Sequence, residues 1–374
     1  MTRKNKQPNP NGDWISWLFK AGLIIVPIVA GYFLISSIFV EKKHPVGNPN
    51  PIAKKYGIEV LTRVYPGLNA GQIDQLLTET WSRMLAYETF TQFREHTYVG
   101  EYVNIDANGF RVVKNQGPWP PARENFNVFV FGGSVTVGYG VRDAESVPSY
   151  LQEALARVPG RTVRVYNFAR GHYYSVQEFI LYQMLLLKGF IPDMALFIDG
   201  SNDFYYADNT ALFTRQFEGL STRMLTPARP QQTGKDPDIY YVAKRYGETK
   251  KLIEAVSAVY NIRTVFAWHP IPLYKYDLKY HLFAGEGFAD TSWSNDAYRH
   301  MAAYVQDHPL GNNFIWCADV QEESREPLYV DRYHYTAKLA SMVADCIASG
   351  MIARGLTASP GTSDKSGKPK RVNK

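Results

Sequence analysis

From Asn127 onward, the sequence alternates short apolar stretches of strand length with amphipathic stretches of helical length. This alternation predicts an α/β protein in which a parallel sheet is covered by helices on both faces. We therefore expect one main domain, residues 126–357, built around a sheet of about five strands. The expected strands are 127–131, 162–167, 194–198, 262–268 and 313–317. The expected helices are 146–157, 175–189, 246–260, 293–306 and a last one that begins at about Thr336.

The segments outside this alternation divide the rest of the chain. Residues 69–125 contain a helical pattern that begins at Asn69 and a tight turn at Asn108-Gly109, and we expect an N-terminal extension packed on the main domain. Residues 204–245 are rich in aromatic and turn residues and are expected to form an insertion, either a lid over the site or a loop that only packs. The remaining segments are interpreted as a short basic tail (1–20), a linker (41–68) and a disordered basic tail (358–374).

The net charge of +6 is located at the two ends of the chain. Residues 1–20 carry a net charge of +3 and the tail from Ala358 carries +4, so residues 21–357 carry −1. A nucleic-acid-binding domain would show a basic patch or stripe in its folded body. This distribution therefore argues against nucleic acid as a partner.

Residues 21–40 read AGLIIVPIVAGYFLISSIFV and contain no charge, which is enough to cross a hydrocarbon core of roughly 30 Å as a helix. A buried core helix and a cleaved signal peptide are the alternatives, but polar flanks argue against the first. A cleaved signal peptide would need a small-residue cleavage site after the apolar stretch, but Glu41-Lys42-Lys43 follows instead. We expect an uncleaved membrane anchor with the main domain exported, although the basic residues on its two sides are balanced. Cys317 and Cys346 could pair or remain reduced, and the position of Cys346 on the apolar stripe of the last helix favours a plain core residue.

Polar residues suited to catalysis follow four of the expected elements. Ser134 follows the first strand, Gly171 the second and Asn202 the third, and Asp331 with His334 precedes the last helix. In a doubly wound sheet, functional groups collect beyond the carboxyl ends of the strands. We therefore expect these groups to converge on one edge of the sheet.

These residue types match the requirements of acyl transfer. Ser134 could attack a carbonyl carbon while His334 removes its proton, and Asp331 could fix the imidazole tautomer. The oxyanion hole is expected to consist of the backbone N–H groups of Ser134 and Gly171 and the side-chain amide of Asn202. Taken singly, Gly171 could only ease a turn, Asn202 could cap a helix, and Asp331 and His334 could cap the last helix.

The four blocks FGGSVTVGYG, NFARG, GSND and DRYH resemble those of the SGNH hydrolases, also called the GDSL-like esterase and lipase family. The resemblance covers roughly residues 127–351 and implies a flavodoxin-like, three-layer α/β/α sandwich. It also implies esterase, lipase, thioesterase or O-acetyltransferase activity without a cofactor. The eight histidines show no H-E-x-x-H or similar clustering, so we expect no metal site. Two positions depart from the family pattern: Gly133 stands where the family has an aspartate, and Ala169-Arg170 stands where many members have a glycine.

Together these features predict a membrane-anchored bacterial serine esterase in the inner membrane, with its catalytic domain on the extracytoplasmic side. By analogy with the family, its substrate would be an O-acetyl group on an envelope or secreted polysaccharide. An O-acetyltransferase with the same triad, a lipase or thioesterase, and a catalytically silent envelope-assembly factor are the alternatives. His172 and His269 could line the substrate pocket or be structural. The aromatic residues near the insertion could bind sugars or acyl chains, or belong to the core; they are Phe204, Tyr205, Tyr206, Tyr240, Tyr241, Tyr274, Tyr276 and Tyr280.

Overall fold

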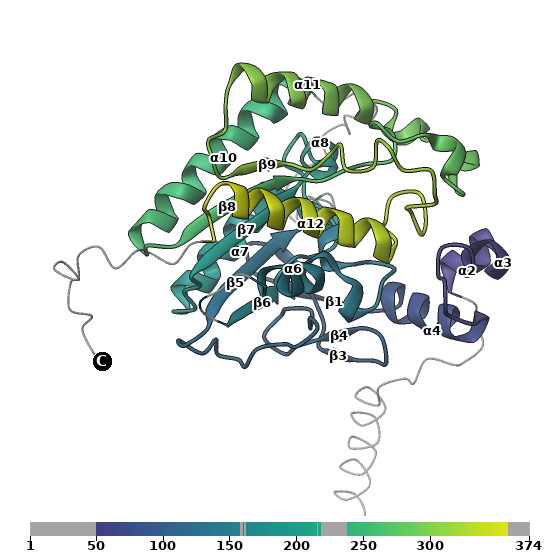
Figure 1. Ribbon diagram of the computed structural model, residues 1–374, viewed down its shortest axis with the longest axis horizontal. Helices are drawn as coiled ribbons and strands as arrows, with labels where there is room; N and C mark the ends of the chain where they lie inside the picture. Colours follow the sequence, from purple (N-terminus) through teal and green to yellow (C-terminus); the bar gives the residue numbers. More distant parts are fainter. Residues whose placement is uncertain (1–49, 158–159, 161, 215, 218–237, 358–374) are drawn as a thin grey trace, which may run out of the picture. The chain divides into compact units, whose positions relative to one another are not determined.

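A five-stranded parallel sheet lies at the centre of the computed structural model (Figure 1). Its strands are β5 (Phe126–Gly132), β6 (Val163–Asn167), β7 (Met194–Asp199), β8 (Arg263–Trp268) and β9 (Phe314–Trp316). They lie in the order β6-β5-β7-β8-β9, and every neighbouring pair is parallel. This is the flavodoxin-like order, in which the chain changes direction across the sheet between the first and third strands. The sequence prediction of the five strands and their parallel arrangement is confirmed.

The structure describes residues 50–157, 160, 162–214, 216–217 and 238–357. The predicted membrane anchor, residues 21–40, and the two predicted basic tails lie outside these ranges. Within the described ranges, no helix combines the length and apolar character that crossing a bilayer requires.

Helices cover both faces of the sheet and complete three layers (Figure 1). On one face lie α6 (Val147–Leu155) and α12 (Ala337–Ala353), which run side by side, and on the other lie α7 (Ser175–Leu187), α10 (Ile239–Val259) and α11 (Ser294–Asp307). Alternating side chains of β5 serve the two faces, since Val128 and Val130 pack toward α6 and α12 while Phe129 and Phe131 pack toward α7. The run Val128 to Phe131 of β5 is therefore continuously apolar, as expected for a parallel strand buried on both faces.

The helix boundaries follow from local capping. Thr336 accepts a hydrogen bond from the backbone of Leu339 and starts α12 at the position that the sequence predicts. Asp238 caps α10, which begins seven residues before the predicted start at residue 246, so the part of the expected insertion from Ile239 onward is helix. The last two residues of α8 (Ser201–Tyr205) begin that insertion, whereas residues 218–237 lie outside the described ranges.

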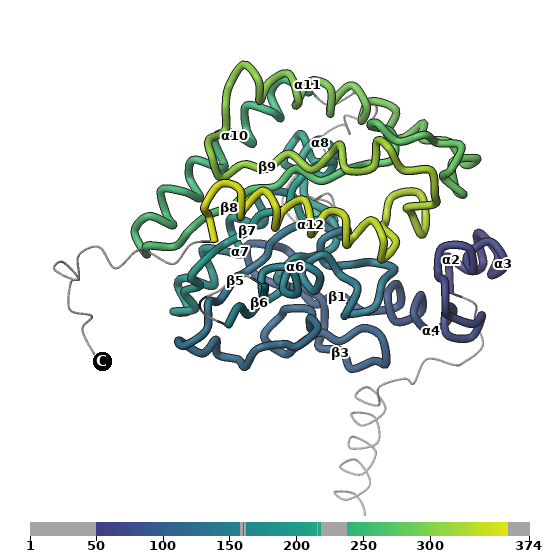
Figure 2. Tube along the Cα trace, in the orientation of Figure 1, coloured from purple at the N-terminus to yellow at the C-terminus, as the bar shows by residue number. Residues whose placement is uncertain are grey.

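Residues 50–68 differ from the expected linker. They form α2 (Pro51–Tyr56) and α3 (Ile58–Leu61), which pack against α4 (Ala70–Trp81) and bury Leu61. The same part of the chain appears in purple and blue in Figure 2. Helices this short contain too few turns to show a hydrophobic period in the sequence, which explains the different prediction.

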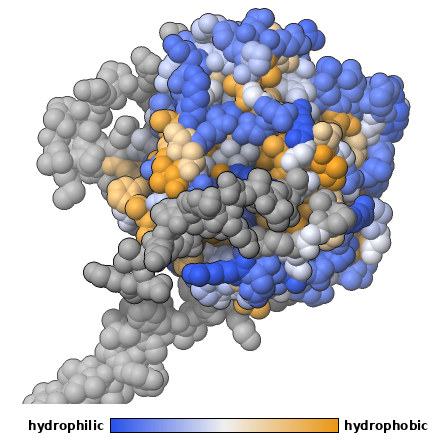
Figure 3. Space-filling model, turned by 60° about the vertical axis from the view of Figure 1, so that its left-hand side comes forward, coloured by the Kyte–Doolittle hydropathy of each residue, from blue (hydrophilic) through white to orange (hydrophobic). Residues whose placement is uncertain are grey.

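Short strands complete the N-terminal extension. They form two antiparallel pairs: β1 (Leu85–Glu88) with β2 (Gln92–Glu95), and β3 (Tyr98–Val99) with β4 (Asn104–Ile105). The predicted turn at Asn108-Gly109 follows β4, with Gly109 at a φ of +85°. The buried Glu79 carboxylate of α4 accepts backbone hydrogen bonds from Glu101, Tyr102 and Val103 and so connects α4 to these strands. On the face shown in Figure 3, hydrophilic residues separate smaller apolar patches.

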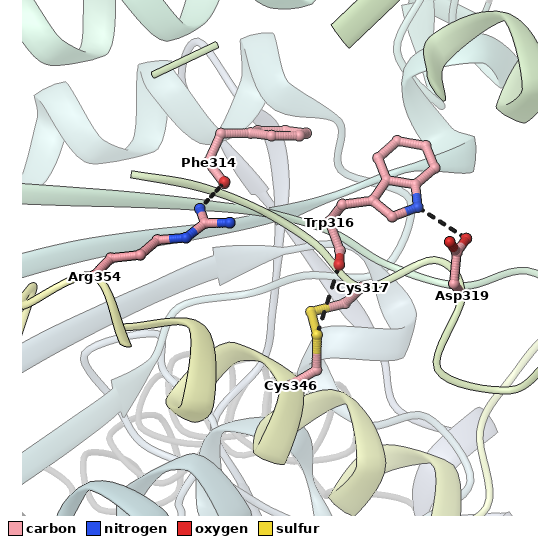
Figure 4. The surroundings of a disulfide bond; sticks show 6 residues. All are labelled: Phe314, Trp316, Cys317, Asp319, Cys346 and Arg354. Atoms are coloured by element: carbon pink, nitrogen blue, oxygen red, sulfur yellow. Dashed lines mark hydrogen bonds between the residues drawn. A yellow bond between two sulfur atoms is a disulfide. The ribbon is translucent and has the colours of Figure 1, made fainter. Parts of the chain in front are cut away.

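Cys317 and Cys346 form a disulfide bond, which corrects the expectation that Cys346 is a plain core residue (Figure 4). Cys317 directly follows the edge strand β9, and Cys346 projects toward it from α12. Two further contacts surround the bond: Arg354 donates to the carbonyl oxygen of Phe314, and the Trp316 indole donates to Asp319. In the described sheet β9 has a neighbour on one side only, and the disulfide and the Arg354 bond connect this edge of the sheet to α12.

Candidate active site

The predicted site residues meet at the carboxyl edge of the sheet. Ser134 is the first residue of α5 (Ser134–Val137), directly beyond β5, and Asn202 lies in α8, directly beyond β7. Strand β5 pairs with β6 on one side and with β7 on the other. The two residues therefore lie at the point where the strand order reverses, which is where ligands bind in sheets of this kind.

A chain of hydrogen bonds connects Asp331, His334 and Ser134. His334 Nε2 lies 3.0 Å from Ser134 Oγ, and His334 Nδ1 lies 2.7 Å from Asp331 Oδ2. The second oxygen of Asp331 accepts the backbone N–H groups of Tyr333 at 2.8 Å and His334 at 2.7 Å. The carboxylate thus fixes both the loop and the imidazole that it faces.

The buried Asp331 carboxyl is ionised by its surroundings. Burial alone would raise its pKa, but the charge of His334 and the hydrogen bonds from His334 and Tyr333 outweigh burial and lower the pKa below its ordinary value. An ionised carboxylate at Nδ1 keeps the proton on that nitrogen and leaves Nε2 free to accept the serine proton. The arrangement meets the geometric requirement for a serine nucleophile with its base.

A buried arginine holds the turn that carries Ser134. The Arg111 guanidinium donates to the carbonyl oxygens of Val137 at 2.9 Å and Val141 at 2.7 Å, and its Nε pairs with Asp143 at 2.8 Å. Arg111 is 1% exposed. Because α5 has only four residues, these side-chain bonds fix its last turn where the helix itself cannot.

Asn202 faces the nucleophile turn. Its Nδ2 donates one hydrogen bond to the carbonyl oxygen of Tyr173 at 2.7 Å, which leaves the second amide hydrogen for a ligand. A Cβ placed on Gly133 would lie 2.7 Å from the same nitrogen, so the glycine permits this approach. The departure from the family pattern at residue 133 therefore has a local structural reason.

Gly171, the remaining candidate for the oxyanion hole, lies behind Tyr139. A Cβ on Gly171 would lie 2.4 Å from the Tyr139 hydroxyl oxygen. Its neighbours His172 and Tyr173 line the cavity beside Ser134, whereas Gly171 is not among the lining residues. The role of Gly171 in the oxyanion hole stays a prediction.

The triad opens into a cavity of about 370 Å³. Ser134, Asn202 and His334 lie in its wall, and most of its other lining residues are buried. His269 lines the cavity and is also structural: its Nδ1 lies 2.9 Å from the Tyr335 hydroxyl, and burial lowers its pKa to about 4. Of the aromatic residues singled out in the sequence, Tyr205 lines the cavity and is 59% exposed, whereas Phe204 is buried in the core.

Aromatic residues pack around the catalytic histidine. The Trp81 ring meets the His334 ring edge to face at 5.7 Å, and the Tyr139 ring lies 5.5 Å from it. The Tyr139 hydroxyl donates to Glu95 at 3.0 Å, and Glu95 forms a buried ion pair with Arg83 at 2.8 Å. Trp81, Arg83 and Glu95 all belong to the N-terminal extension, which therefore forms part of the site.

Two buried carboxyl groups lie in the cavity wall away from the triad. Glu178 and Asp199 are 1% and 3% exposed, and they neighbour each other, with the Tyr246 hydroxyl beside Asp199. Burial, with added repulsion from Asp199 and Asp203, raises the pKa of Glu178 well above its ordinary value. Burial and repulsion from Asp203 raise that of Asp199 as well. Asp203 itself has a counter-charge, Arg245, at 3.7 Å.

The sequence predicted Ser134, His334, Asp331 and Asn202 at one edge of the sheet, and the structure brings all four together. It did not predict Trp81, the last residue of α4, as part of the site. Arg111, which follows the Asn108-Gly109 turn, also went unpredicted. No local pattern distinguishes an arginine that binds carbonyl oxygens 26 or more residues away from a solvent-exposed one.

The model of the GDSL-like lipase/acylhydrolase family matches residues 130–340. Among solved structures, a putative lipolytic protein of the G-D-S-L family from Desulfitobacterium hafniense is 11% identical, with 60% of this chain and 99% of that chain covered and a TM-score of 0.37. A catalytic mutant of Axe2, an acetylxylan esterase from Geobacillus stearothermophilus, is 12% identical, with coverage of 60% and 93% and a TM-score of 0.37. The acetyl xylan esterase AlAXEase is 16% identical, with coverage of 60% and 98% and a TM-score of 0.39. No curated protein matches the sequence.

Proposed function

Because the chain belongs to the GDSL-like lipase/acylhydrolase family, whose members are serine hydrolases acting on esters, we propose that it is a membrane-anchored esterase that removes short acyl groups from carbohydrate hydroxyls. Ser134 is the nucleophile, His334 the general base and Asp331 the residue that orients the base. The substrate class that we propose is an O-acetylated polysaccharide of the cell envelope or one that the cell secretes.

The observation that carries the proposal is the hydrogen-bond chain from Asp331 through His334 to Ser134 at the wall of a cavity. Ser134 Oγ attacks the ester carbonyl carbon while His334 Nε2 takes its proton. The negative charge that develops on the carbonyl oxygen meets the Ser134 backbone N–H at the start of α5 and the second amide hydrogen of Asn202. Each such donor stabilises the transition state by about 3 to 4 kcal/mol in serine hydrolases.

The remaining steps return the enzyme to its starting state. His334 gives its proton to the departing alcohol oxygen, and the C–O bond breaks to leave an acyl group on Ser134. A water molecule then attacks the acyl carbon while His334 takes one of its protons. His334 returns a proton to Ser134 Oγ as the bond between this oxygen and the acyl carbon breaks, and the carboxylic acid leaves. Asp331 stabilises the imidazolium that forms in both halves of the reaction.

The chemistry of the cavity wall favours a short acyl group. The carboxyl groups of Glu178 and Asp199 lie in its buried part, where they neighbour each other and the Tyr246 hydroxyl lies beside Asp199. A wall that contains two buried carboxyl groups is less favourable for a long alkyl chain than a wholly apolar tunnel would be. Acetate is therefore the acyl group that we propose, ahead of a fatty acyl chain.

Two features support the proposed location outside the cytoplasm. The uncharged residues 21–40 have the length of a membrane-spanning helix. The chain contains the Cys317–Cys346 disulfide, and disulfide bonds persist in oxidising compartments but are rare in the cytosol. Treatment of cell lysates with a thiol-reactive polymer under denaturing, non-reducing conditions tests this location. An unshifted protein that shifts only after reduction supports it, and a shift without reduction contradicts it.

Activity is tested with the full chain in detergent and p-nitrophenyl esters of increasing acyl length. We expect the highest kcat/KM for acetate and loss of turnover in Ser134→Ala and His334→Ala. Release of acetate from O-acetylated polysaccharide identifies the substrate class, and appearance of the acetyl group on an added sugar instead would indicate a transferase. A preference for long-chain esters would contradict the proposal and favour a lipase or thioesterase.

A further inference from the structure

His172 has a backbone conformation that is unusual for a residue with a side chain. Its φ is +63°, in the left-handed region, although the glycine that would adopt this conformation without strain stands one residue earlier. A non-glycine residue held there costs roughly 1–2 kcal/mol, and such residues cluster at active sites and ligand clamps. The backbone at residues 171–172 therefore places the imidazole of His172 at the cavity, where a glycine would leave only main-chain atoms.

His172 lies at the mouth of the cavity. Among the residues that line the cavity, His172, Tyr205 and Asp290 are the exposed ones, while Ser134, Asn202 and His334 lie deeper. An ester bound with its carbonyl at Ser134 and its acyl group in the buried part of the cavity extends its alcohol toward this mouth. His172 is thus placed beside the alcohol part of the substrate.

The imidazole of His172 is oriented by Tyr206. The Tyr206 hydroxyl lies 3.1 Å from His172 Nδ1, and Tyr206 is 4% exposed. Arg245 of α10 holds the Tyr206 backbone by donating to its carbonyl oxygen at 3.0 Å. The ring of His172 is therefore supported by a buried residue that is itself fixed.

This hydrogen bond also selects the tautomer. Burial raises the pKa of Tyr206, so its hydroxyl keeps its proton, and within the described part of the chain His172 Nδ1 is the acceptor within hydrogen-bond distance of that hydroxyl. A buried hydroxyl hydrogen left unpaired would be costly, so Tyr206 donates and Nδ1 accepts. Part of His172 reaches solvent, but desolvation of its imidazole by the surrounding protein and the charge of His334 lower the pKa of His172, which favours the neutral ring. The remaining hydrogen is then on Nε2.

We propose that His172 determines specificity for the alcohol part of the ester: its Nε2–H donates a hydrogen bond to a hydroxyl or ring oxygen near the scissile bond. The enzyme consequently prefers esters of polyhydroxylated alcohols, such as sugars, over esters of alkyl alcohols of the same size. This inference rests on the proposed function in that Ser134 must hydrolyse esters. It adds a residue to substrate recognition and does not alter the triad.

The test compares two acetate esters that differ only in hydroxyl groups, glycerol 1-acetate and n-propyl acetate, with the full chain in detergent. We expect the wild-type kcat/KM to favour the glycerol ester. In His172→Gly, which removes the imidazole and suits the left-handed backbone, the ratio of the two kcat/KM values falls by about 3- to 10-fold, mainly through KM. Tyr206→Phe, which frees the ring to rotate, lowers the ratio by a smaller factor.

Two variants control for the backbone. Asn261, exposed and at a φ of +54° between α10 and β8, has the same kind of conformation far along the chain, and Asn261→Gly leaves the ratio unchanged. His172→Asn tolerates the left-handed conformation and shows the same loss as His172→Gly. An unchanged ratio in His172→Gly, or an equal decrease for both esters, overturns this inference alone. Absence of Ser134-dependent turnover of both esters in the wild type refutes the proposed function and this inference with it.

Discussion

Removal of the Cys317–Cys346 disulfide tests whether the contacts at the edge of the sheet have the energetic importance that their position indicates. The bond joins residues 29 positions apart, and the segment that it closes contains Asp331 and His334. In the chain-entropy model, a closed loop of about 30 residues lowers the entropy of the unfolded chain by roughly 12 cal/mol/K. At 25 °C this corresponds to about 3.5 kcal/mol of stability.

The measurement is urea unfolding of the full chain in detergent, wild type against the double variant Cys317→Ala/Cys346→Ala. We expect the free energy of unfolding to fall by about 3 to 4 kcal/mol in the double variant, and by a similar amount in reduced wild type. Reduction should not destabilise the double variant further. The folded double variant should keep most of its esterase activity, because Arg354 still binds the Phe314 carbonyl oxygen and holds α12 on β9.

A loss below about 1 kcal/mol in both the double variant and reduced wild type would refute this reasoning. It would mean that the segment between the two cysteines is already constrained in the unfolded chain, so that closing the loop removes little entropy.

Three further predictions concern the site. Gly133→Asp, which restores the residue typical of the family, should lower kcat by about 10²-fold, because a Cβ at this position collides with Asn202, the proposed oxyanion donor. Glu178→Gln should flatten the pH dependence of stability. In wild type, the folded state retains a proton on Glu178 that the unfolded chain releases at about pH 4.3. The free energy of unfolding of wild type therefore falls as pH rises above that value, by up to about 1.4 kcal/mol per pH unit. Trp81→Ala should lower kcat/KM by roughly 10-fold because the His334 ring loses its edge contact, with Trp81→Phe intermediate.

Each of these predictions has its own control. Gly133→Ala should be impaired as well, since the collision involves the Cβ itself, and full activity in that variant would contradict the steric explanation. Glu323→Gln, at a carboxylate that is 91% exposed, should leave the pH dependence of unfolding unchanged, and equal slopes for Glu178→Gln and wild type would contradict the assignment. For Trp81, thermal unfolding separates loss of histidine support from loss of fold, and wild-type kinetics in Trp81→Ala would show that the ring contact has no catalytic role.

The elements that the sequence predicted well are those with strong local signals. Strands β5 and β7 each contain a continuous buried apolar run, residues 128–131 and 194–198, flanked by turn residues, so burial alone marks their position. The helices between them leave few possible topologies. Ser134, Asn202 and His334 were found because each follows or precedes such an element. Their convergence is a consequence of the parallel sheet.

The features that the sequence did not predict depend on contacts between distant segments. Arg111 and Asp143 are 32 residues apart, and the edge contact of Trp81 with His334 spans the N-terminal extension and the last loop. Pairing of Cys317 with Cys346 requires β9 and α12 to meet, which no periodic pattern specifies. The imidazole of His172 is oriented by Tyr206, which is 34 residues away in the sequence. The left-handed backbone conformation of His172 is not indicated by any local sequence pattern.

The most direct test of the central claim is to identify the residue that a fluorophosphonate probe modifies in the full chain. The account predicts a single adduct on the peptide that contains Ser134, no adduct in Ser134→Ala, and loss of p-nitrophenyl acetate turnover in proportion to labelling. Labelling of another residue, or esterase activity that persists in Ser134→Ala, would contradict the assignment of Ser134 as the nucleophile.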